Sequence, residues 1–177
     1  MKYFPKITGE KIYLSPINPD DYELYTQRMN DNSITDNLGN TFIIQTIYDE
    51  KKLLTDKMPE NTFAIIKKEN NELIGNISLE IKYPVHRTAT IGIFIGKKEN
   101  QNKGYGTQAI QLMLNFAFNT LNLNNIMLEV FDFNQSAIKC YHKCGFKEIG
   151  RRRKAVFIQG QYHDVVFMDI LAEEFKK

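Results

Sequence analysis

The fold of this chain follows from one stretch of sequence, Ile93-Phe94-Ile95-Gly96-Lys97-Lys98-Glu99-Asn100-Gln101-Asn102-Lys103-Gly104-Tyr105-Gly106. It begins as a β-strand, continues as a charged, amide-rich loop, and ends in glycines that open a helix. Glycine removes side-chain bulk where a ligand must touch the backbone, and the first N–H groups of a helix have no intrahelical acceptor. The helix dipole and Lys103 add positive charge at the same point. The stretch therefore predicts an anion-binding site suited to a pyrophosphate group.

Two other phosphate-binding patterns compete with this interpretation. The P-loop requires G-x-x-x-x-G-K-[ST], and the sequence contains no such run. The dinucleotide fingerprint G-x-G-x-x-G/A is matched by Gly104, Gly106 and Ala109, and Glu129 follows about twenty residues later, where a ribose-binding acid is expected. An eight-residue loop precedes Gly104 in place of the tight turn that this fingerprint needs, yet an NAD-type dinucleotide-binding domain stays open as an alternative.

A second motif lies downstream, Asn134-Gln135-Ser136-Ala137-Ile138-Lys139-Cys140-Tyr141, followed by Cys144-Gly145-Phe146. It resembles the N-x-x-A-x-x-x-Y-x-x-x-G-F signature of the GCN5-related N-acetyltransferases, the GNAT superfamily. The run from Gln101 to Gly106 resembles the Q/R-x-x-G-x-G/A acetyl-CoA loop of the same superfamily. Both motifs occur at the family spacing, and the order of the predicted strands and helices resembles the GNAT fold over nearly the whole chain. It implies an acyltransferase that takes acetyl-CoA as acyl donor and an amine as acceptor, with no metal.

The resemblance also implies roles for individual residues. Backbone groups of one strand would pair with the pantetheine arm of the cofactor, namely those of Ile93, Phe94 and Ile95. The loop and helix start would wrap the pyrophosphate through Gln101, Asn102, Lys103, Gly104, Tyr105, Gly106 and Thr107. On the next helix Asn134 and Ala137 would face the cofactor, and Tyr141 would be the catalytic acid that protonates the departing thiolate.

The general base remains open at this stage. An attacking amine must lose a proton, and three acids on the central strands are candidates, directly or through water: Glu80, Glu129 and Asp132. Each is equally well explained as a solvated residue of a strand. None is assigned as catalytic.

Composition describes a globular protein. The 177 residues are 42% hydrophobic and 25% charged, enough for one domain over residues 1–177 with its own core. A formal charge of +2, from 23 basic and 21 acidic residues, predicts no nucleic-acid partner. Without an apolar run of eighteen residues or a signal-peptide core at residues 1–6, we expect no membrane partner and a cytoplasmic protein. The basic run 151–154 is expected to be a solvated loop or strand edge, or else a contact with CoA phosphates or with an acidic part of the substrate. A homo-oligomer stays open.

The two cysteines, Cys140 and Cys144, are four residues apart on one predicted helix. We expect thiols at this spacing to be buried apolar side chains rather than a disulfide or a metal site. His142 projects from the opposite face, so the three side chains cannot converge on zinc. The sequence predicts no metal.

Turn signals and apolar periodicity predict a mixed α/β fold with a central six- to seven-stranded sheet and flanking helices. The expected helices span residues 19–29, 46–57, 105–121 and 134–145. The expected strands span residues 11–15, 61–67, 72–82, 88–95, 125–131, 147–150 and 162–170. The GNAT resemblance implies that the strands ending at Ile95 and Phe131 run parallel and splay apart, which leaves a V-shaped opening for the cofactor.

Within the superfamily the chain looks closest to the branch of ribosomal-protein alanine and spermidine N-acetyltransferases. Polyamine enzymes carry an acidic cluster after the first helix, whereas residues 31–42 here offer only Asp31 and Asp36. Because each unpaired ammonium removed from water costs several kcal/mol, we expect a protein or peptide N-terminus as acceptor, with spermidine or another small amine as the alternative. A non-catalytic acyl-CoA-binding module is the remaining alternative.

Overall fold

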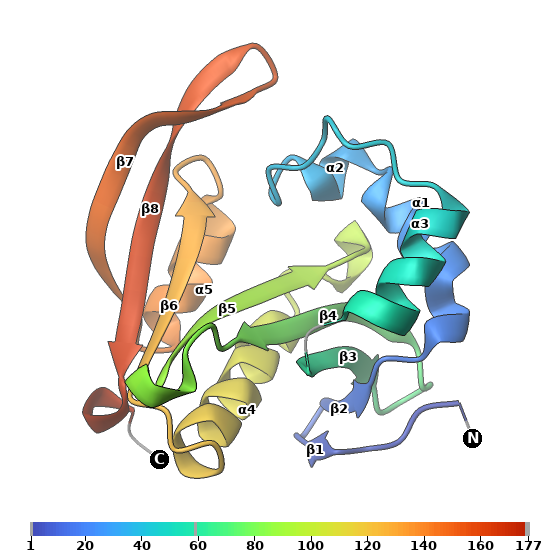
Figure 1. Cartoon of the computed structure of the whole chain (residues 1–177), viewed down its shortest axis with the longest axis horizontal. Coiled ribbons are helices and arrows are strands. Elements are labelled where there is room, and N and C mark those ends of the chain that lie inside the picture. Colours follow the sequence, from blue (N-terminus) through green and yellow to red (C-terminus); the bar gives the residue numbers. More distant parts are fainter. Residues whose placement is uncertain (1, 59, 176–177) are drawn as a thin grey trace.

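The computed structural model describes residues 2–58 and 60–175 as helices packed on one sheet (Figure 1). The sheet has eight strands in the order β1-β2-β3-β4-β5-β6-β8-β7. All neighbouring strands are antiparallel except β5 and β6, which are parallel. The strands are β1 (Ile7–Thr8), β2 (Ile12–Pro16), β3 (Asn61–Lys67), β4 (Leu73–Glu80), β5 (Thr88–Ile95), β6 (Asn125–Phe131), β7 (Lys147–Ile158) and β8 (Gln161–Leu171).

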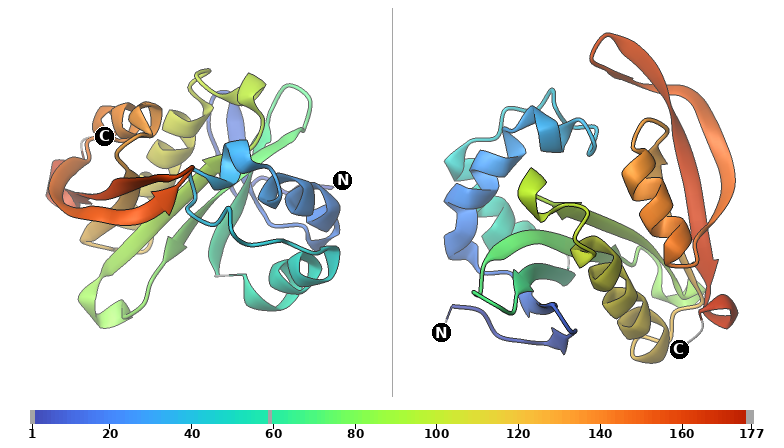
Figure 2. Two further views of the ribbon diagram at one scale, coloured as in Figure 1. Left: turned by 90° about the horizontal axis from the view of Figure 1, so that it is seen from above. Right: turned by 180° about the vertical axis from the view of Figure 1, so that it is seen from behind.

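The helices lie on both faces of the sheet (Figure 2). On one face lie α1 (Tyr22–Met29), α2 (Asn32–Thr35) and α3 (Ile47–Lys52), which continues as a π-helical turn, η2 (Leu53–Lys57). On the other face lie α4 (Tyr105–Asn119) and α5 (Gln135–Lys143). Short 3-10 turns complete the chain: η1 (Pro19–Asp21), η3 (Pro84–His86), η4 (Lys98–Asn100) and η5 (Ala172–Glu174).

Strand β3 shows why both faces must be covered. Phe63 and Ile65 belong to the larger core beneath α4 and α5, whereas Ala64 and Ile66 belong to a second core beneath α1 and η2. Successive side chains of a strand point to opposite faces, so a strand that is apolar throughout needs a layer on each side. Strand β6 is not apolar on both faces, because Glu129, which lies between buried Leu128 and Val130, is exposed.

The parallel pair β5–β6 opens along its length. Cα partners run only from Thr88↔Asn125 to Thr90↔Met127, although β5 continues to Ile95 and β6 to Phe131. Over the same residues β5 stays paired with β4, as far as Gly75↔Ile95. The predicted mixed α/β sheet with splayed parallel strands is therefore confirmed.

Several predicted boundaries were wrong. The sheet has eight strands rather than six or seven, since β1 was missed. Strand β7 extends to Ile158 instead of ending at Gly150, so the basic run 151–154 lies on the outermost strand of the sheet, as one of its two interpretations required. Residues 32–35, which lie outside the expected helices, form α2, and the second predicted helix changes from α to π at Leu53. Among the described residues, no helix is long and apolar enough to cross a membrane.

Candidate active site

A cavity of about 570 Å³ occupies the opening between β5 and β6. Such a volume is in the range of small-molecule sites. Its walls come from β5, the glycine loop (residues 96–106), the first turn of α4, the end of β6, α5 and the segment that contains α2 (residues 31–42, the α2 segment). The predicted cofactor residues that line it are Ile93, Phe94, Ile95, Gln101, Asn102, Gly104, Gly106, Thr107, Asn134 and Ala137, together with Tyr141.

The glycine loop enters α4 through a conformation that favours glycine. Gly104 precedes α4 with φ +84°, a left-handed conformation that favours glycine. Gly106 lies in the first turn, where an added Cβ would be 3.9 Å from Ile95 Cγ1 and closer to no other heavy atom outside its own helix and chain neighbours. The protein itself therefore does not require glycine at position 106. The cavity in front of it instead requires a small residue there, glycine or alanine, if backbone N–H groups are to reach a ligand.

Two other members of the predicted set, Lys103 and Tyr105, do not line the cavity. Lys103 is exposed, and its carbonyl oxygen accepts a hydrogen bond of 3.4 Å from Lys11 Nζ. The Tyr105 side chain packs against the main core, with Lys67 Nζ 5.7 Å from its ring centroid. Their cofactor roles stay predictions, and those roles must come from backbone groups or from long-range charge.

Helix α5 supplies the opposite wall. Asn134 caps it, because its Oδ1 accepts a hydrogen bond of 3.1 Å from the Ala137 N–H. One residue into the helix, Ser136 Oγ donates to Asn102 Oδ1 at 3.3 Å and so ties α5 to the glycine loop. Lys139 and Lys143, one turn apart, also line the cavity. These two cations were missed by sequence reasoning, and their i, i+4 spacing around the motif was the available signal.

Tyr141 lies between the core and the cavity. Its ring is 9% exposed and meets Phe146 edge-on at 5.9 Å between centroids. Burial raises the pKa of Tyr141, so the hydroxyl stays protonated at neutral pH. A protonated phenol that faces a cavity can donate to an anion that forms there.

Only one of the three candidate bases lines the cavity. Glu129 does so from the exposed face of β6, and it is the single acid among the described lining residues. Asp132 instead pairs with His163, with 3.2 Å between Oδ1 and Nδ1. Glu80 ends β4, opposite Thr90 in the paired part of the sheet. Glu129 is therefore the acid that the geometry selects.

The α2 segment covers one side of the cavity. It contributes Ser33, Ile34, Asn37 and Leu38 to the lining. Its approach to β6 depends on Gly39, where φ is +71° and an added Cβ would lie 2.6 Å from Phe131 Cζ. The acids of the segment have local partners: Asp31 Oδ1 accepts from the Ser33 N–H, and buried Asp36 accepts from Thr41 Oγ1 at 2.7 Å and from Gln159 Nε2. Neither carboxylate is free of the protein's own hydrogen bonds.

The cysteines pack between α4 and α5. Cys140 Sγ lies 3.2 Å from Thr107 Oγ1, Cys144 is buried, and both thiols are free. Across residues 2–58 and 60–175, no cluster of three or more His, Cys, Asp or Glu side chains is arranged to hold a metal ion.

The whole arrangement has a counterpart in a known family. A family model described as "Acetyltransferase (GNAT) domain" matches residues 11–147, well over half of the chain. The chain belongs to the GNAT acetyltransferase family. Membership confirms the predicted acyltransferase and the predicted acyl donor, acetyl-CoA, and it leaves the NAD-type alternative without support.

Known GNAT proteins place the chain in the predicted branch. Over 117 residues, 66% of each chain, it is 38% identical to a protein of Vibrio cholerae named "Spermidine N(1)-acetyltransferase". Over 107 residues, 60% of this chain and 58% of the other, it is 32% identical to "Putative ribosomal N-acetyltransferase YdaF" of Bacillus subtilis. The structure of spermidine N-acetyltransferase from Vibrio cholerae in complex with CoA and spermine matches with a TM-score of 0.85 at 27% identity, over 94% of this chain and 99% of that one. These relatives favour the alternative acceptor, a polyamine, over the expected protein N-terminus.

Proposed function

We propose that this GNAT protein transfers the acetyl group of acetyl-CoA to a primary amine of a small polyamine. The observation that carries acetyl transfer is that Tyr141 and Glu129 both line one cavity at the strand opening, and the similarity to spermidine N-acetyltransferases favours a polyamine as acceptor. The amine nitrogen attacks the thioester carbon, the carbon–sulfur bond breaks, and the sulfur leaves as a thiolate. Tyr141 then donates its proton to that thiolate, and Glu129 accepts the proton that the amine loses, directly or through water.

The cofactor side of the proposal rests on charge and on backbone groups. The open edge of β5 beyond Thr90 has no partner strand on the β6 side, and the amide groups of pantetheine can hydrogen-bond to it as a neighbouring strand would. Lys139 and Lys143 add two cations to the cavity lining, and the N-terminal end of α4 adds the positive end of its helix dipole. Phosphate groups are stabilised by both.

Glu129 gives the proposal a residue-level test. In the Glu129→Gln variant we expect the KM for the amine to rise about tenfold, because a charge-assisted hydrogen bond to an ammonium is lost while the side-chain shape is kept. The fall in kcat should be largest at neutral pH and smaller at high pH, where more of the amine is already neutral. Steady-state kinetics at several pH values measures both. Glu80→Gln is the matched control, since that acid lies outside the cavity lining and should change neither constant. Unchanged kinetics in Glu129→Gln would remove Glu129 from the mechanism.

A second acceptor class is favoured by one observation. Asp31 and Asp36 are occupied by the α2 segment and the β7–β8 hairpin, so few carboxylates remain to match several ammonium groups. A peptide N-terminus presents one amine of pKa about 8 and needs fewer acids. A panel of spermidine, spermine, an aminoglycoside and N-terminal peptides, assayed by mass spectrometry for acetyl transfer, decides between the classes. Acetylation of peptides with none of either polyamine would overturn the proposed acceptor.

A further inference from the structure

Strands β6 and β8 leave one face of the sheet open beside the acetyl-CoA cavity. On the opposite face their side chains Leu128, Val130 and Met168 belong to the larger core beneath α4 and α5. Helices α1 and α3 lie at the β2–β4 end of the sheet, away from β6 and β8 (Figure 1). Side chains that alternate with the buried ones, such as Glu129, therefore point away from the core and are reachable from solvent.

Four side chains of β6 and β8 lie together on this open face. Glu129 is the cross-strand partner of Phe167, and two residues earlier on β6, Met127 is the partner of Asp169. Diagonal neighbours in an antiparallel pair lie about 7–8 Å apart. The two carboxylates thus occupy one diagonal and the two apolar side chains the other. Because Glu129 lines the cavity, the group of four extends the site along the sheet.

The two apolar members of the group, Met127 and Phe167, are only half-buried. Among the described residues, they belong to neither of the two hydrophobic cores. An apolar surface that is partly in water is stabilised when methylene groups cover it. Since the two side chains flank the line between the carboxylates, they suit an aliphatic chain with a cation at each end.

Asp169 is held in place but keeps its charge available. Its Oδ2 accepts a hydrogen bond of 2.7 Å from Asn125 Nδ2. Its cross-strand partner on β7 is Lys147, whose ammonium group pairs with Glu174 instead. Asp169 is half-buried, and within the part of the chain that the structure describes it forms no ion pair. A carboxylate accepts several hydrogen bonds, so Asp169 can take an ammonium group as well.

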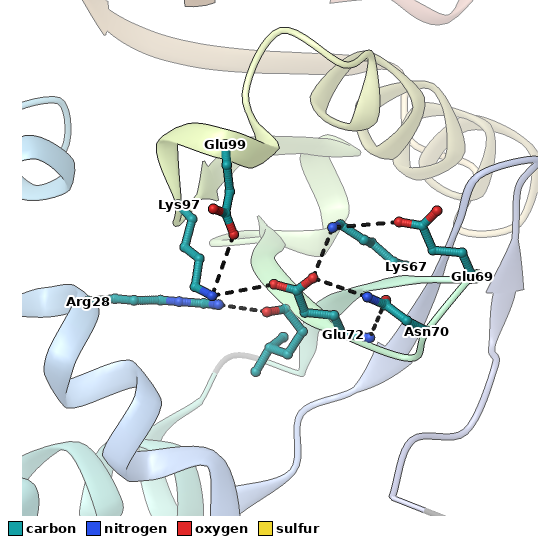
Figure 3. Close-up of polar contacts among 8 residues, drawn as sticks. Arg28, Lys67, Glu69, Asn70, Glu72, Lys97 and Glu99 are labelled. Atoms are coloured by element: carbon teal, nitrogen blue, oxygen red, sulfur yellow. Dashed lines mark hydrogen bonds and ion pairs between the residues drawn. The ribbon is translucent and has the colours of Figure 1, made fainter.

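Acids beside the glycine loop, by contrast, are paired with lysines of the protein itself. Figure 3 shows Glu72 between two lysines, with Oε2 2.9 Å from Lys67 Nζ and Oε1 3.7 Å from Lys97 Nζ. Glu69 lies 3.7 Å from the same Lys67 ammonium, and Glu99 lies 3.6 Å from that of Lys97. A polyamine would have to displace a lysine to bind there.

We propose that Asp169 binds the second ammonium group of the polyamine acceptor and so selects polyamines over monoamines. The reacting amine lies at Glu129, and the methylene groups that follow it lie between Met127 and Phe167. Four methylenes place two ammonium groups about 6 Å apart, and each hydrogen bond to a carboxylate adds about 3 Å of reach, which matches the diagonal. Asp169 supplies the second carboxylate that the α2 segment does not. This role rests on the proposed function, since a peptide N-terminus need not carry a second ammonium group.

Acetylation kinetics with matched acceptors tests the role of Asp169. Wild type should have a higher kcat/KM for 1,4-diaminobutane than for butylamine, which has the same carbon chain and one amine. In the Asp169→Asn variant, kcat/KM for the diamine should fall about tenfold through a higher KM, and kcat/KM for butylamine should not change. Asparagine keeps the side-chain shape, and its carbonyl oxygen still accepts from Asn125. A loss of structure would instead affect both acceptors and the affinity for acetyl-CoA.

Glu80→Gln is the matched control. Glu80 lies on the same open face, in the row of Thr90 and Met127, but it is two strands from Met127 on the side away from Asp169. Its replacement should leave the preference for the diamine unchanged.

Equal kcat/KM values for the two acceptors in wild type would overturn the proposal. An unchanged preference in Asp169→Asn, or an equal loss for both acceptors, would overturn it too. These outcomes leave polyamine acetylation itself intact. Failure of the proposed function is a different result, namely no acetylation of any polyamine by wild type, and it would overturn both.

Discussion

Replacing Tyr141 with phenylalanine is expected to slow turnover by roughly 10²–10⁴-fold while acetyl-CoA affinity changes little. The change removes one hydroxyl and keeps the ring that packs on Phe146. A thiolate of pKa about 8.5 and a phenol of pKa about 10 differ by roughly 2 kcal/mol in an aqueous reference. Burial raises the pKa of Tyr141, and it would raise that of a thiolate in the same cavity as well, so the difference between donor and acceptor need not grow.

A matched control separates this effect from the loss of any buried phenol hydroxyl. Tyr25 is also buried, at 2% exposed, and its hydroxyl has no hydrogen-bond partner among the described residues, but it lies in the second core beneath α1 and η2. Tyr25→Phe should therefore keep wild-type turnover. Single-turnover kinetics is the required measurement, because product release can hide a slower chemical step. Wild-type rates in Tyr141→Phe under those conditions would mean that water or another group protonates the thiolate.

The parts of the fold that sequence predicted well have local signals. The start of α5 follows from Asn134, whose side chain caps the helix, and the start of α4 follows from Gly104 in its left-handed conformation. Strand β3 is apolar on both faces because it has a core on each side. In each case the residue type itself indicates the backbone conformation or the burial of the segment. Prediction succeeded where the physical cause lay within a few residues.

The misplaced end of β7 has a long-range cause. Its pairing with β8 is interrupted between Glu148 and Gly150 and again between Arg152 and Val156, and Lys154 has φ 49°. The Lys154 N–H is satisfied by the Asp164 carboxylate of the opposite strand. These charged residues show no alternation of apolar and polar side chains, so only the partner strand reveals that they are in the sheet. Helix α2 was missed for a different reason, because its four residues are too few for a helical period.

The residues of the candidate site also fall into two groups, those that local sequence predicts and those that depend on long-range contacts. The glycine loop and the Tyr141 motif could be recognised from sequence because each is a contiguous stretch. Glu129 looks like any solvent-facing residue of an amphipathic strand, and its place in the cavity depends on where β5 and β6 separate. Residues chosen by strand divergence or by long-range packing are not predictable from local pattern.

In the Gly106→Val variant we expect acetyl-CoA binding to be lost without loss of the fold. Wild type in acetyl-CoA at a hundred times its dissociation constant should gain about 2.7 kcal/mol of unfolding free energy, seen as a higher melting temperature. The valine side chain has room in the protein, whose nearest group outside the helix is Ile95 Cγ1 at 3.9 Å from an added Cβ. It would instead occupy the space in front of the first-turn N–H groups, where a pyrophosphate must approach. The ligand-dependent rise in melting temperature should therefore disappear.

Two further variants make this result specific to the cavity. Gly106→Ala should bind acetyl-CoA nearly as well as wild type, because the family motif accepts either residue at this position, and it should be slightly more stable without ligand, since alanine favours a helix over glycine by about 1 kcal/mol. Gly150→Val places the same side chain in open space on β7, away from the cavity, and should retain the full rise in melting temperature. If Gly106→Val kept the acetyl-CoA-dependent rise, the pyrophosphate would have to bind elsewhere than at the start of α4. A loss in Gly150→Val as well would instead trace the effect to general destabilisation.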